Sequence, residues 1–567
     1  MKTYKLCLLG VLTLPIILFA QNPLAIPDTL SGSAINLTIK DSSRTWYAGY
    51  STNTIGLNTS YLGPTLILQK GTLTQFNVQN LLADTTTIHW HGLHLAPSND
   101  GGPHTTIAPS SIWTPSFPIM DQAGTYWYHS HLHNKTVEQV TKGEAGLIII
   151  RDSIEATINL PRKYNVDDFP IIIQTKCFDS NKQLAVNTAG DSVVMVNGTL
   201  SPYLQVPAQV IRLRLLNASI NRIFKLGLHN NQNIIQIGSD GGLLSQPVSL
   251  SRLQLAPGER AEVLLDLTGM QGQQININSY SSELANGIYG AANPSAMGPG
   301  VIPGYASNPL NGINFKILQL NITTPTSNPI TSIPTNLVPV NPLPASSANL
   351  TFPISISPQA MGPNGMLNGP FQLNNQLFNM QTINHTTTLG STEIWSITNN
   401  TAIAHPFHVH GLQFYVLDRN GFAPPVNEQG RKDVIMVYAQ ETIKIIMQFE
   451  DFTDNVIPFM YHCHMLTHEE DGMMAQYLVL NATGIDDSNM AYNAVLIFPN
   501  PCSANVNVHS KSEILRTEIV DVLGRIIYSS NEKYTFKNID LPETPSGLYV
   551  IKTFGKNSST THRIVIQ

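Results

Sequence analysis

The hydrophobic residues of this chain fall into many short runs with turn residues between them. Short runs rich in Val, Ile, Leu and Thr are typical of β-strands, and Gly, Pro, Asn and Asp bound most of these runs. Stretches with the 3.6-residue period of an amphipathic helix are scarce. The strands that this pattern predicts include residues 63–68, 72–78, 146–150, 169–174, 210–216, 234–237 and 262–267. We therefore expect an all-β protein.

The predicted strands group into blocks of the size of a β-sandwich domain. A chain of 567 residues exceeds what one hydrophobic core usually serves, so several domains are expected. Residues 323–344 are dense in Pro, Thr, Ser and Asn, which favours an extended linker. Gly and Pro within 285–309 indicate a long surface loop. We predict domains at 21–157, 158–325 and 346–484, a linker at 326–345, and a small C-terminal β-sandwich at 490–567.

The first twenty residues are typical of a secretory signal peptide. Lys2 and Lys5 precede the apolar stretch 6–19, and Ala20 is a small residue at the expected cleavage point. The stretch is short for a membrane span, and no stop-transfer pattern follows it. A lipoprotein anchor is disfavoured because Cys7 lies before the apolar stretch rather than after it. We expect residues 1–20 to be a signal peptide and the protein to be secreted or held at the cell surface.

Composition narrows the class of partner. Charged residues make up 12% of the chain and the formal net charge is -6, so neither nucleic acid nor a polybasic contact with a membrane is expected. The four cysteines, Cys7, Cys177, Cys463 and Cys502, are too few and too scattered for a disulfide framework. Cys463 needs a different explanation because it lies between two histidines.

Ten of the 17 histidines lie in four short clusters. The clusters are His89-Trp-His91, His129-Ser-His131, His405-Pro-Phe-His408-Val-His410, and His462-Cys463-His464 followed by His468. Alternate residues of a strand share a face, so each His-X-His pair directs two imidazoles the same way. Four such pairs, drawn from two domains, predict a cluster of several metal ions held by eight imidazoles.

The same alternation predicts a second, separate site. Cys463 lies between two histidines of a pair, so its thiol faces the opposite side of the strand. His405 lies three residues before His408, so its side chain also differs in face from the pair of His408 and His410. A thiolate with two imidazoles and a weak thioether is the blue-copper ligand set. We predict Cys463, His405 and His468 as ligands, with Met473 as the axial ligand and Met474 as its alternative. The tripeptide around Cys463 then joins both sites through a few bonds, which predicts an electron path.

Other interpretations of the histidines carry less weight. A single His-X-His pair is more often an ordinary pair than a metal site, and zinc is the commonest competitor for His and Cys. Structural zinc sites favour four ligands at CxxC and HxxxH spacings, which differ from four His-X-His pairs. Among the remaining histidines, His94 and His104 lie in a loop flanked by Gly and Pro. His133 shares parity with His131, so we expect it to support the ligands rather than to join them.

The four clusters resemble the copper-binding signature of the multicopper oxidases, the family that includes laccases, ascorbate oxidase and bacterial cuprous oxidases. The resemblance covers about residues 30–480 and is greatest to the bacterial three-domain laccase and copper-resistance type. Supporting stretches are DGGP at 100–103, SDGG at 239–242, PGER at 257–260 and GMM at 472–474. The resemblance implies three cupredoxin-like Greek-key β-sandwich domains, the middle one without copper.

The resemblance also implies a role for each ligand. His89 and His408 would bind the single normal copper of a trinuclear cluster. The coupled pair of this cluster would be bound by His91, His129, His131, His410, His462 and His464. The blue copper, which accepts electrons from the substrate, would be bound by His405, Cys463, His468 and Met473. The expected cofactors are therefore four copper ions.

Reduction of dioxygen to water also consumes four protons, so acids that carry protons must reach the cluster. Asp100 and Glu469 match acidic positions that serve this role in similar enzymes, and a carboxylate beside a metal site passes protons when its pKa suits. The alternatives are a turn residue for Asp100, which precedes two glycines, and a surface acid for Glu469.

The substrate class follows from one departure from the family pattern. Cuprous-oxidising relatives carry a Met-rich insertion and a methionine shortly before the first histidine of the third cluster. Here Ile403 precedes His405, and only Met361, Met366 and Met380 occupy the comparable stretch. Because thioethers are the ligands that select Cu(I), we predict a laccase-like activity on phenols or aromatic amines with dioxygen as acceptor. The alternatives are a metal-ion oxidase acting on Cu(I), Fe(II) or Mn(II), and a non-enzymatic electron carrier or structural cupredoxin.

The last block, from about residue 490, resembles the C-terminal sorting domain of the type IX secretion pathway. The matching stretches are FPNP at 498–501, VLGRI at 522–526 and SGLYV at 546–550. The resemblance implies that secretion machinery is a partner, and Cys502 would leave with the domain if it is removed. The alternative is an extra β-sandwich that binds a ligand.

Overall fold

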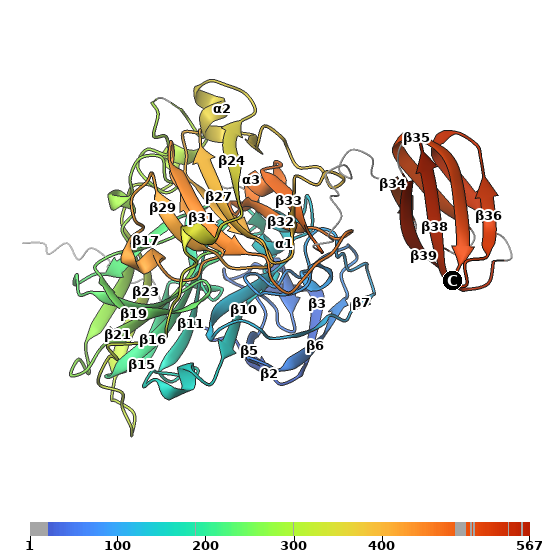
Figure 1. Ribbon diagram of the computed structural model, residues 1–567. Helices are drawn as coiled ribbons and strands as arrows, with labels where there is room; N and C mark the ends of the chain where they lie inside the picture. Colours follow the sequence, from blue (N-terminus) through green and yellow to red (C-terminus); the bar gives the residue numbers. More distant parts are fainter. Residues whose placement is uncertain are drawn as a thin grey trace, which may run out of the picture. The chain divides into compact units, whose positions relative to one another are not determined.

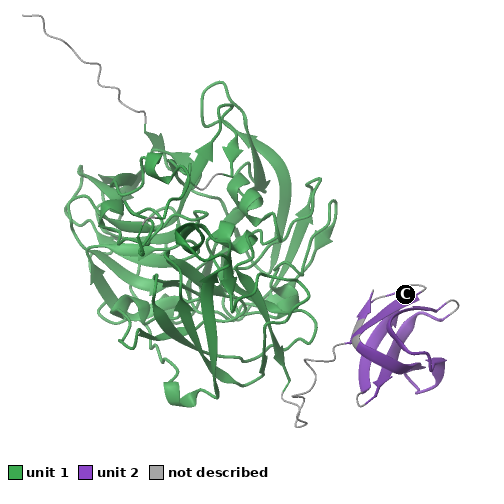
Figure 2. Ribbon diagram, turned by 90° about the horizontal axis from the view of Figure 1, so that it is seen from above, with its two compact units in different colours: residues 1–481 green, residues 482–567 purple. Residues whose placement is uncertain are grey.

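The computed structural model describes residues 21–186, 189–298, 300–481, 495–498, 500, 502, 505–541, 544–556 and 559–567. The predicted signal peptide at 1–20 lies outside these residues. The chain forms two compact units, residues 1–481 and 482–567, which Figure 2 shows in different colours. Strands account for nearly all regular structure, and every strand predicted above overlaps an observed one. The expectation of an all-β protein is confirmed.

The first sandwich packs two sheets around a core that includes Phe76, Trp90 and Tyr126. One sheet runs in the order β2 (Thr29–Ser31), β5 (Thr65–Gln69), β10 (Ala145–Arg151), β9 (Gly124–His129). The other runs β4 (Thr52–Leu57), β3 (Ala34–Arg44), β6 (Leu73–Asn80), β7 (Ile112–Trp113), with β8 (Ser116–Pro118) also paired to β6. The short helix α1 (Thr136–Lys142) connects β9 to β10 and ends at Gly143, which has a positive φ of 115°.

The second sandwich follows directly and includes the start of the described chain. Its first sheet runs β1 (Asn22–Pro23), β15 (Pro202–Pro207), β23 (Phe315–Thr323), β22 (Gln274–Ser279), β17 (Phe224–Leu228), β20 (Leu253–Leu255). Its second sheet runs β14 (Thr199–Leu200), β13 (Val193–Val196), β11 (Asp168–Phe178), β16 (Val210–Asn217), β21 (Arg260–Asp266), β18 (Ile234–Ser239), β19 (Gly242–Leu250), with β12 (Leu184–Ala185) beside β11. Strands such as β16 are buried along their whole length, which explains their continuous hydrophobic runs.

The third sandwich carries half of the histidine clusters on one of its sheets. That sheet runs β26 (His385–Thr388), β33 (Met474–Leu480), β32 (Phe459–Cys463), β28 (His405–Val409), β30 (Val434–Val437). The facing sheet runs β25 (Phe371–Leu373), β24 (Leu350–Pro358), β27 (Thr392–Asn399), β31 (Thr442–Gln448), β29 (Tyr415–Arg419). Helix α2 (Pro363–Asn368) follows β24, and helix α3 (Leu466–Glu470) follows β32. Figure 1 shows α3 beside β32 and β33.

Two long segments without strands differ in how they pack against the sandwiches. Residues 324–349 form no strand, and Ile330, Leu337 and Val338 pack against the second sandwich. The segment 285–309 was expected on the surface, and this expectation is wrong for much of it. Ile288 and Tyr289 belong to the hydrophobic core of the third sandwich, because this long connection between β22 and β23 folds back over that core.

The C-terminal unit has its own hydrophobic core, which includes Val506, Ile519 and Ile551. Its strands are β34 (Val495–Phe498), β35 (Asn505–Asp521), β36 (Ile526–Ser530), β37 (Tyr534–Asp540), β38 (Gly547–Gly555) and β39 (Ser559–Ile566). The long strand β35 pairs with β34 and β37 near its start and with β36 and β38 near its end. Among all described residues, no helix has the length and apolarity that crossing a membrane requires.

Candidate metal centres

The ends of the strands position the histidine clusters. His405 and His408 lie in β28, His462 and Cys463 lie in β32, and β9 ends at His129. The strand argument placed both members of each pair within a strand, and here the structure differs. The second members follow the strand end or an isolated bridge, and they are His91, His131, His410 and His464.

Extended pairing nevertheless continues past the strand ends. The backbone N–H of His410 donates to the carbonyl oxygen of Met460 at 3.0 Å, and that of His464 donates to Pro406 at 2.7 Å. Alternation of side chains therefore persists as far as the second histidine of these two pairs.

The eight paired histidines meet at one point between the first and third sandwiches. Within a pair the ring centroids lie 4.8 to 6.1 Å apart. Rings from the two sandwiches stack, with His91 on His408 at 3.8 Å and His89 on His410 at 3.9 Å. None of the eight side chains is more than 1% exposed. Four pairs that are distant in the sequence thus form one buried cluster, as the alternation predicted.

Six of these histidines form two trios of facing nitrogens. Nδ1 of His91 lies 3.3 Å from Nε2 of His129 and 3.3 Å from Nε2 of His464. In the second trio, Nε2 of His462 lies 3.1 Å from Nε2 of both His131 and His410. Three imidazole nitrogens directed at one point are a suitable donor set for one transition-metal ion.

The remaining two histidines of the cluster, His89 and His408, present a different feature. Nδ1 of His89 donates to the carbonyl oxygen of Asp100 at 2.9 Å, and Nδ1 of His408 donates to that of Asp433 at 2.7 Å. These bonds fix the tautomer and leave a lone pair on each Nε2. Both Nε2 atoms are buried, and neither has a hydrogen-bond partner in the described part of the chain. Because an unpartnered buried polar atom costs about 1–3 kcal/mol, a metal ion at this position accounts for their arrangement.

Electrostatics keep the cluster ready to bind metal. Burial lowers the pKa of His91, His131 and His410, and the neighbouring rings lower it further. For His462, burial lowers the pKa to about 3. These four imidazoles are therefore neutral near pH 7, with lone pairs available to a metal ion without prior loss of protons.

A second group of possible ligands lies on the other side of β32. Sγ of Cys463 is 3.5 Å from Nδ1 of His405 and 3.7 Å from Nδ1 of His468, and these two nitrogens are 3.2 Å apart. The three atoms form a compact triangle, which is the arrangement of a thiolate and two imidazoles in a blue-copper site. Burial raises the pKa of the Cys463 thiol and lowers that of His468 to about 3.

The surroundings of this second group are apolar. Phe371 packs edge-on against both imidazoles, with its ring centroid 4.6 Å from His405 and 4.7 Å from His468. The backbone of Met473 is held here, since its carbonyl oxygen accepts from Cys463 N at 3.1 Å and its N–H donates to His468 O at 2.9 Å. The Met473 side chain is buried in the same core. Met474 instead pairs with His462 across the sheet.

Both predicted proton carriers are buried beside the cluster. Asp100 accepts a hydrogen bond from Nδ1 of His410 through Oδ2 at 2.8 Å, and its Oδ1 is 3.5 Å from Nδ1 of His89. On the opposite side, the carboxyl oxygens of Glu469 lie 3.4 Å from Nδ1 of His131 and 3.2 Å from Nδ1 of His462. Burial raises the pKa of Glu469 well above its usual value. The alternative that Glu469 is a surface acid is wrong, because its side chain is only 2% exposed.

Two functional neighbours were missed in the sequence. Asp433 accepts a hydrogen bond from Nε2 of His91 at 3.1 Å, and Arg260 donates to both of its carboxyl oxygens at 2.6 Å. Thr401 accepts one from Nε2 of His405 at 2.9 Å. Arg260 lies in the PGER stretch and Thr401 lies near the third cluster, but an aspartate directly before a strand and a threonine in a loop carry no signal of their own.

The other histidines do not join either group. His94 bonds to Asp451 at 2.9 Å, and His104 bonds to Gln476 at 2.8 Å. His133 packs against Phe378 with ring centroids 5.2 Å apart. Within the described residues it makes no hydrogen bond to the cluster, so the supporting role expected for it is not seen.

Comparison with known proteins identifies relatives for both units. Residues 38–155 and 349–483 match family models described as multicopper oxidase, and residues 496–567 match the secretion system C-terminal sorting domain. The chain is 34% identical to multicopper oxidase mco of Staphylococcus epidermidis over 79% of this chain and 89% of that protein. It is 30% identical to cell division protein FtsP of Photorhabdus laumondii over 81% of this chain and 93% of that protein.

A solved structure gives the same result. The crystal structure of laccase from Pediococcus acidilactici superposes with a TM-score of 0.70 and 31% identity, covering 81% of this chain and 94% of that chain. The likeness confirms the expected fold of cupredoxin-like sandwiches with a further small β domain. This chain belongs to the multicopper oxidase family and ends in a secretion-system C-terminal sorting domain.

Proposed function

We propose that this protein is a laccase-like oxidase that takes single electrons from phenols or similar donors and reduces dioxygen to water. Family membership supports copper binding and oxidoreductase chemistry. The observation that carries the proposal is the convergence of eight buried imidazoles at one point, with a separate group of one thiol and two imidazoles on the other side of β32. An electron carrier needs only the second group.

The residues present fit four copper ions. We assign His89 and His408 to one ion of a trinuclear cluster, the trio of His91, His129 and His464 to a second, and the trio of His131, His410 and His462 to a third. We assign His405, Cys463, His468 and Met473 to the blue copper. When bound, copper supplies reversible one-electron chemistry and the capacity to reduce dioxygen.

The chain itself supplies the route between the two groups. Cys463 contributes its thiol to one group, while its neighbours His462 and His464 belong to the two trios of the other. Electrons therefore need to cross only a few covalent bonds. His468 is 8% exposed, whereas the other ligand candidates are almost fully buried, so a donor meets the protein at this ring.

The two carboxyl groups supply protons on opposite sides of the cluster. Asp100 touches His410 through Oδ2, and Glu469 lies against His131 and His462. A group at hydrogen-bond distance of the ligands holds a proton where oxygen reduction consumes it. We propose Asp100 and Glu469 as the proton carriers.

We also propose the domain limits given above. Residues 1–20 are removed as a signal peptide, and the C-terminal unit directs export. The sorting-domain match supports secretion or display at the cell surface, with secretion machinery as the partner.

Copper-loaded protein provides the test. We expect about four copper ions per chain, an intense blue absorbance, and dioxygen uptake with a phenolic donor. Cys463→Ser removes the thiolate and with it the blue absorbance, whereas Cys177→Ser, which changes a partly exposed thiol outside both groups, leaves it intact. Protein that binds copper fully yet consumes no dioxygen with any donor would contradict the proposal.

A metal-ion oxidase acting on Cu(I), Fe(II) or Mn(II) is the nearest alternative. Comparing dioxygen uptake with each metal ion and with a phenolic donor separates it from the laccase-like activity. A structural or carrier role, the alternative of another class, predicts one copper ion or none per chain.

A further inference from the structure

A cavity of about 310 Å³ lies beside His468. Residues of all three sandwiches line it, among them Val137 of α1, Asn221 of the second sandwich, and Glu470 of α3. His468 directs Nδ1 away from the cavity, toward Sγ of Cys463 and Nδ1 of His405. Its ring therefore spans the distance between the candidate blue-copper group and the cavity, which places a bound donor next to the first electron acceptor.

The walls of the cavity are amphipathic. Val186, Ile302, Leu367 and Ile403 provide apolar surface, and Tyr289 provides an aromatic ring. Such walls bury the ring of an aromatic molecule.

The charge in the cavity has a single sign. Apart from His468, the charged residues that line the cavity are Glu470 and Asp471, and both are acidic. One oxygen of Glu470 accepts the backbone N–H of Val137 at 2.8 Å, which aims the carboxylate. The carboxylate of Asp471 receives no hydrogen bond and no ion pair from any described residue, so it is available to a ligand.

We propose that this cavity selects aromatic donors that carry a positive charge, with Glu470 and Asp471 as the specificity-determining residues. The proposal rests on the proposed oxidase function and names its substrate class: phenols, catechols or anilines with an ammonium group. The apolar wall holds the ring, and the carboxylates attract the cation and repel anionic donors.

A bare metal ion fits this cavity less well. Methionine is missing from the residues that line it, although thioethers are what Cu(I) prefers. In the described part of the chain, the groups of three or more potential metal ligands lie in the two clusters already described and include neither Glu470 nor Asp471. An organic cation needs only charge and apolar surface, which the cavity offers together.

The reaction of this donor class balances with dioxygen as the oxidant. Each catechol loses one electron and one proton and becomes a semiquinone, and its ammonium group is unchanged. Four such steps supply the four electrons and four protons that convert one dioxygen to two waters. Pairs of semiquinones then disproportionate to catechol and quinone in solution.

Three catechols that differ only in side-chain charge test the proposal. They are dopamine, which is cationic, 4-methylcatechol, which is neutral, and 3,4-dihydroxyphenylacetate, which is anionic. With copper-loaded protein at low ionic strength we expect kcat/KM to fall in that order, by about tenfold from the first to the last, because attraction of the cation and repulsion of the anion both contribute to this ratio. The ratio should shrink in 0.5 M salt, where the Debye length falls to about 4 Å.

Variants assign the effect to the two carboxylates. Glu470→Gln keeps an oxygen for the N–H of Val137 and removes the charge, and Asp471→Asn removes the other charge. The double variant should bring the ratio of dopamine to dihydroxyphenylacetate close to one. Asp41→Asn is the matched control, because it removes an exposed charge on β3 of the first sandwich and should leave the ratio as it is in the unaltered protein.

A binding measurement separates this proposal from the proposed function. Calorimetric titration of the metal-free protein with the three catechols should give the same order of affinity, with no turnover needed. If the copper-loaded protein takes up no dioxygen with 4-methylcatechol, this result contradicts the proposed oxidase function but not the charge selection. Equal affinities for dopamine and dihydroxyphenylacetate, or a ratio that the double variant leaves intact, would overturn the charge selection whether or not the protein is an oxidase.

Discussion

Most of the candidate ligand imidazoles bond to the protein through one nitrogen and leave the other available to a metal ion. The chain provides an acceptor for the first nitrogen in several ways, such as the carbonyl oxygen of Asp100 for His89 and the carboxylate of Asp433 for His91. At the blue-copper group this acceptor is Thr401. Its hydroxyl also lies within 2.7 Å of the side-chain oxygen of Asn399, to which it donates, so it accepts from Nε2 of His405. Thr401 is therefore a positioning residue that fixes which nitrogen of His405 faces the metal.

Thr401→Val tests this role at nearly constant volume. Loss of the acceptor leaves the N–H of His405 unpaired and makes its imidazole a weaker electron donor, which disfavours the oxidised metal. We expect the reduction potential of the blue copper to rise by up to about 60 mV, one factor of ten for a one-electron couple. Redox titration followed by the blue absorbance measures it.

Two further variants show whether the effect belongs to the hydroxyl. Thr401→Ser keeps the hydroxyl and should restore the original potential. Thr398→Val removes a hydroxyl that bonds instead to Thr442 at 2.9 Å on the same sheet, and should leave the potential unchanged. Equal shifts in Thr401→Val and Thr398→Val would show that the shift is a packing effect.

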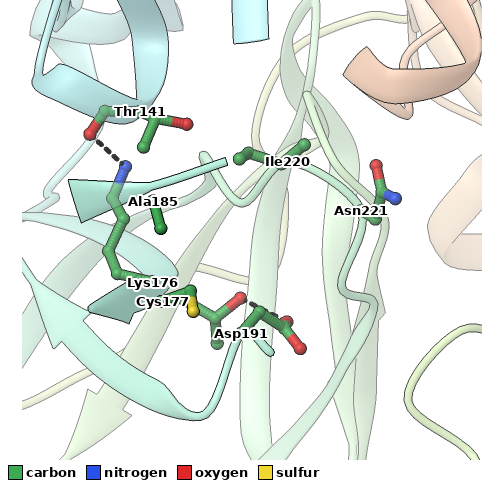
Figure 3. Close-up of a pocket in the computed structure, with 8 residues that line it drawn as sticks. Thr141, Lys176, Cys177, Ala185, Asp191, Ile220 and Asn221 are labelled. Carbon is green, nitrogen blue, oxygen red and sulfur yellow. Dashed lines mark hydrogen bonds between the residues drawn. The ribbon is translucent and has the colours of Figure 1, made fainter. Parts of the chain in front are cut away.

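At the scale of secondary-structure elements, helix α1 links the second sandwich to helix α3, which bears His468. At its start, the N–H of Val137 donates to Glu470 of α3. Near its end, Nζ of Lys176 donates to the carbonyl oxygen of Thr141 at 2.9 Å, as Figure 3 shows. An acid at the start and a base at the end of a helix both complement its dipole. The helix is therefore held at both ends by other parts of the chain.

Lys176 makes this connection sensitive to pH. Lys176 is 2% exposed, no carboxylate among the described residues bonds to it, and burial lowers its pKa from 10.5 to about 7. Between pH 7 and about 10 the unfolded chain then binds more protons than the folded chain, so stability rises with pH in this window, by at most about 1.4 kcal/mol per pH unit. Below pH 7 both states are protonated and the contribution is constant. We expect the melting temperature of the first unit to rise less between pH 7 and 9 in Lys176→Met than in the unaltered protein.

Calorimetric melting at several pH values measures this difference. Lys163→Met is a suitable comparison. Lys163 lies shortly before β11, the strand that carries Lys176, and its side chain makes no hydrogen bond among the described residues. Parallel pH profiles for the unaltered protein and Lys176→Met would show that Lys176 stays charged in the folded state, held so by the helix carbonyls.

The strands and their connections also show how far the sequence predicts this structure. Short hydrophobic runs identified the strands, and alternation predicted that the pairs around His89 and His462 face one point while Cys463 faces away. Both rest on local geometry. No local pattern predicted that the Gly- and Pro-rich connection at Tyr289 would enter the core of the third sandwich, because that burial depends on a surface supplied by a distant part of the chain. Asp433 and Thr401 escaped notice for the same reason.

At the scale of the whole molecule, a buried network of ion pairs and hydrogen bonds joins the first two sandwiches. Arg214 bonds to Asp168 at 2.7 Å and to Glu262 at 2.6 Å within the second sandwich, and to Thr125 of the first at 3.0 Å. All of these side chains are fully buried. Breaking one partner of such a network leaves an uncompensated buried charge, so the first and second sandwiches are expected to unfold together.

The C-terminal unit has no part in that network and possesses a separate core around Val506 and Ile551. Every residue assigned to copper, and every residue that lines the donor cavity, lies before Asn481. A chain that ends at Asn481 should therefore bind the same amount of copper, show the same blue absorbance, and melt within about 2 °C of the full chain in its main transition. In the host cell the shortened chain should fail to reach the exterior, since the sorting domain is absent, and cell fractionation with a copper assay measures both outcomes. Copper loss on truncation would mean that the second unit supports the metal centres, whereas normal export would mean that it serves a purpose other than sorting.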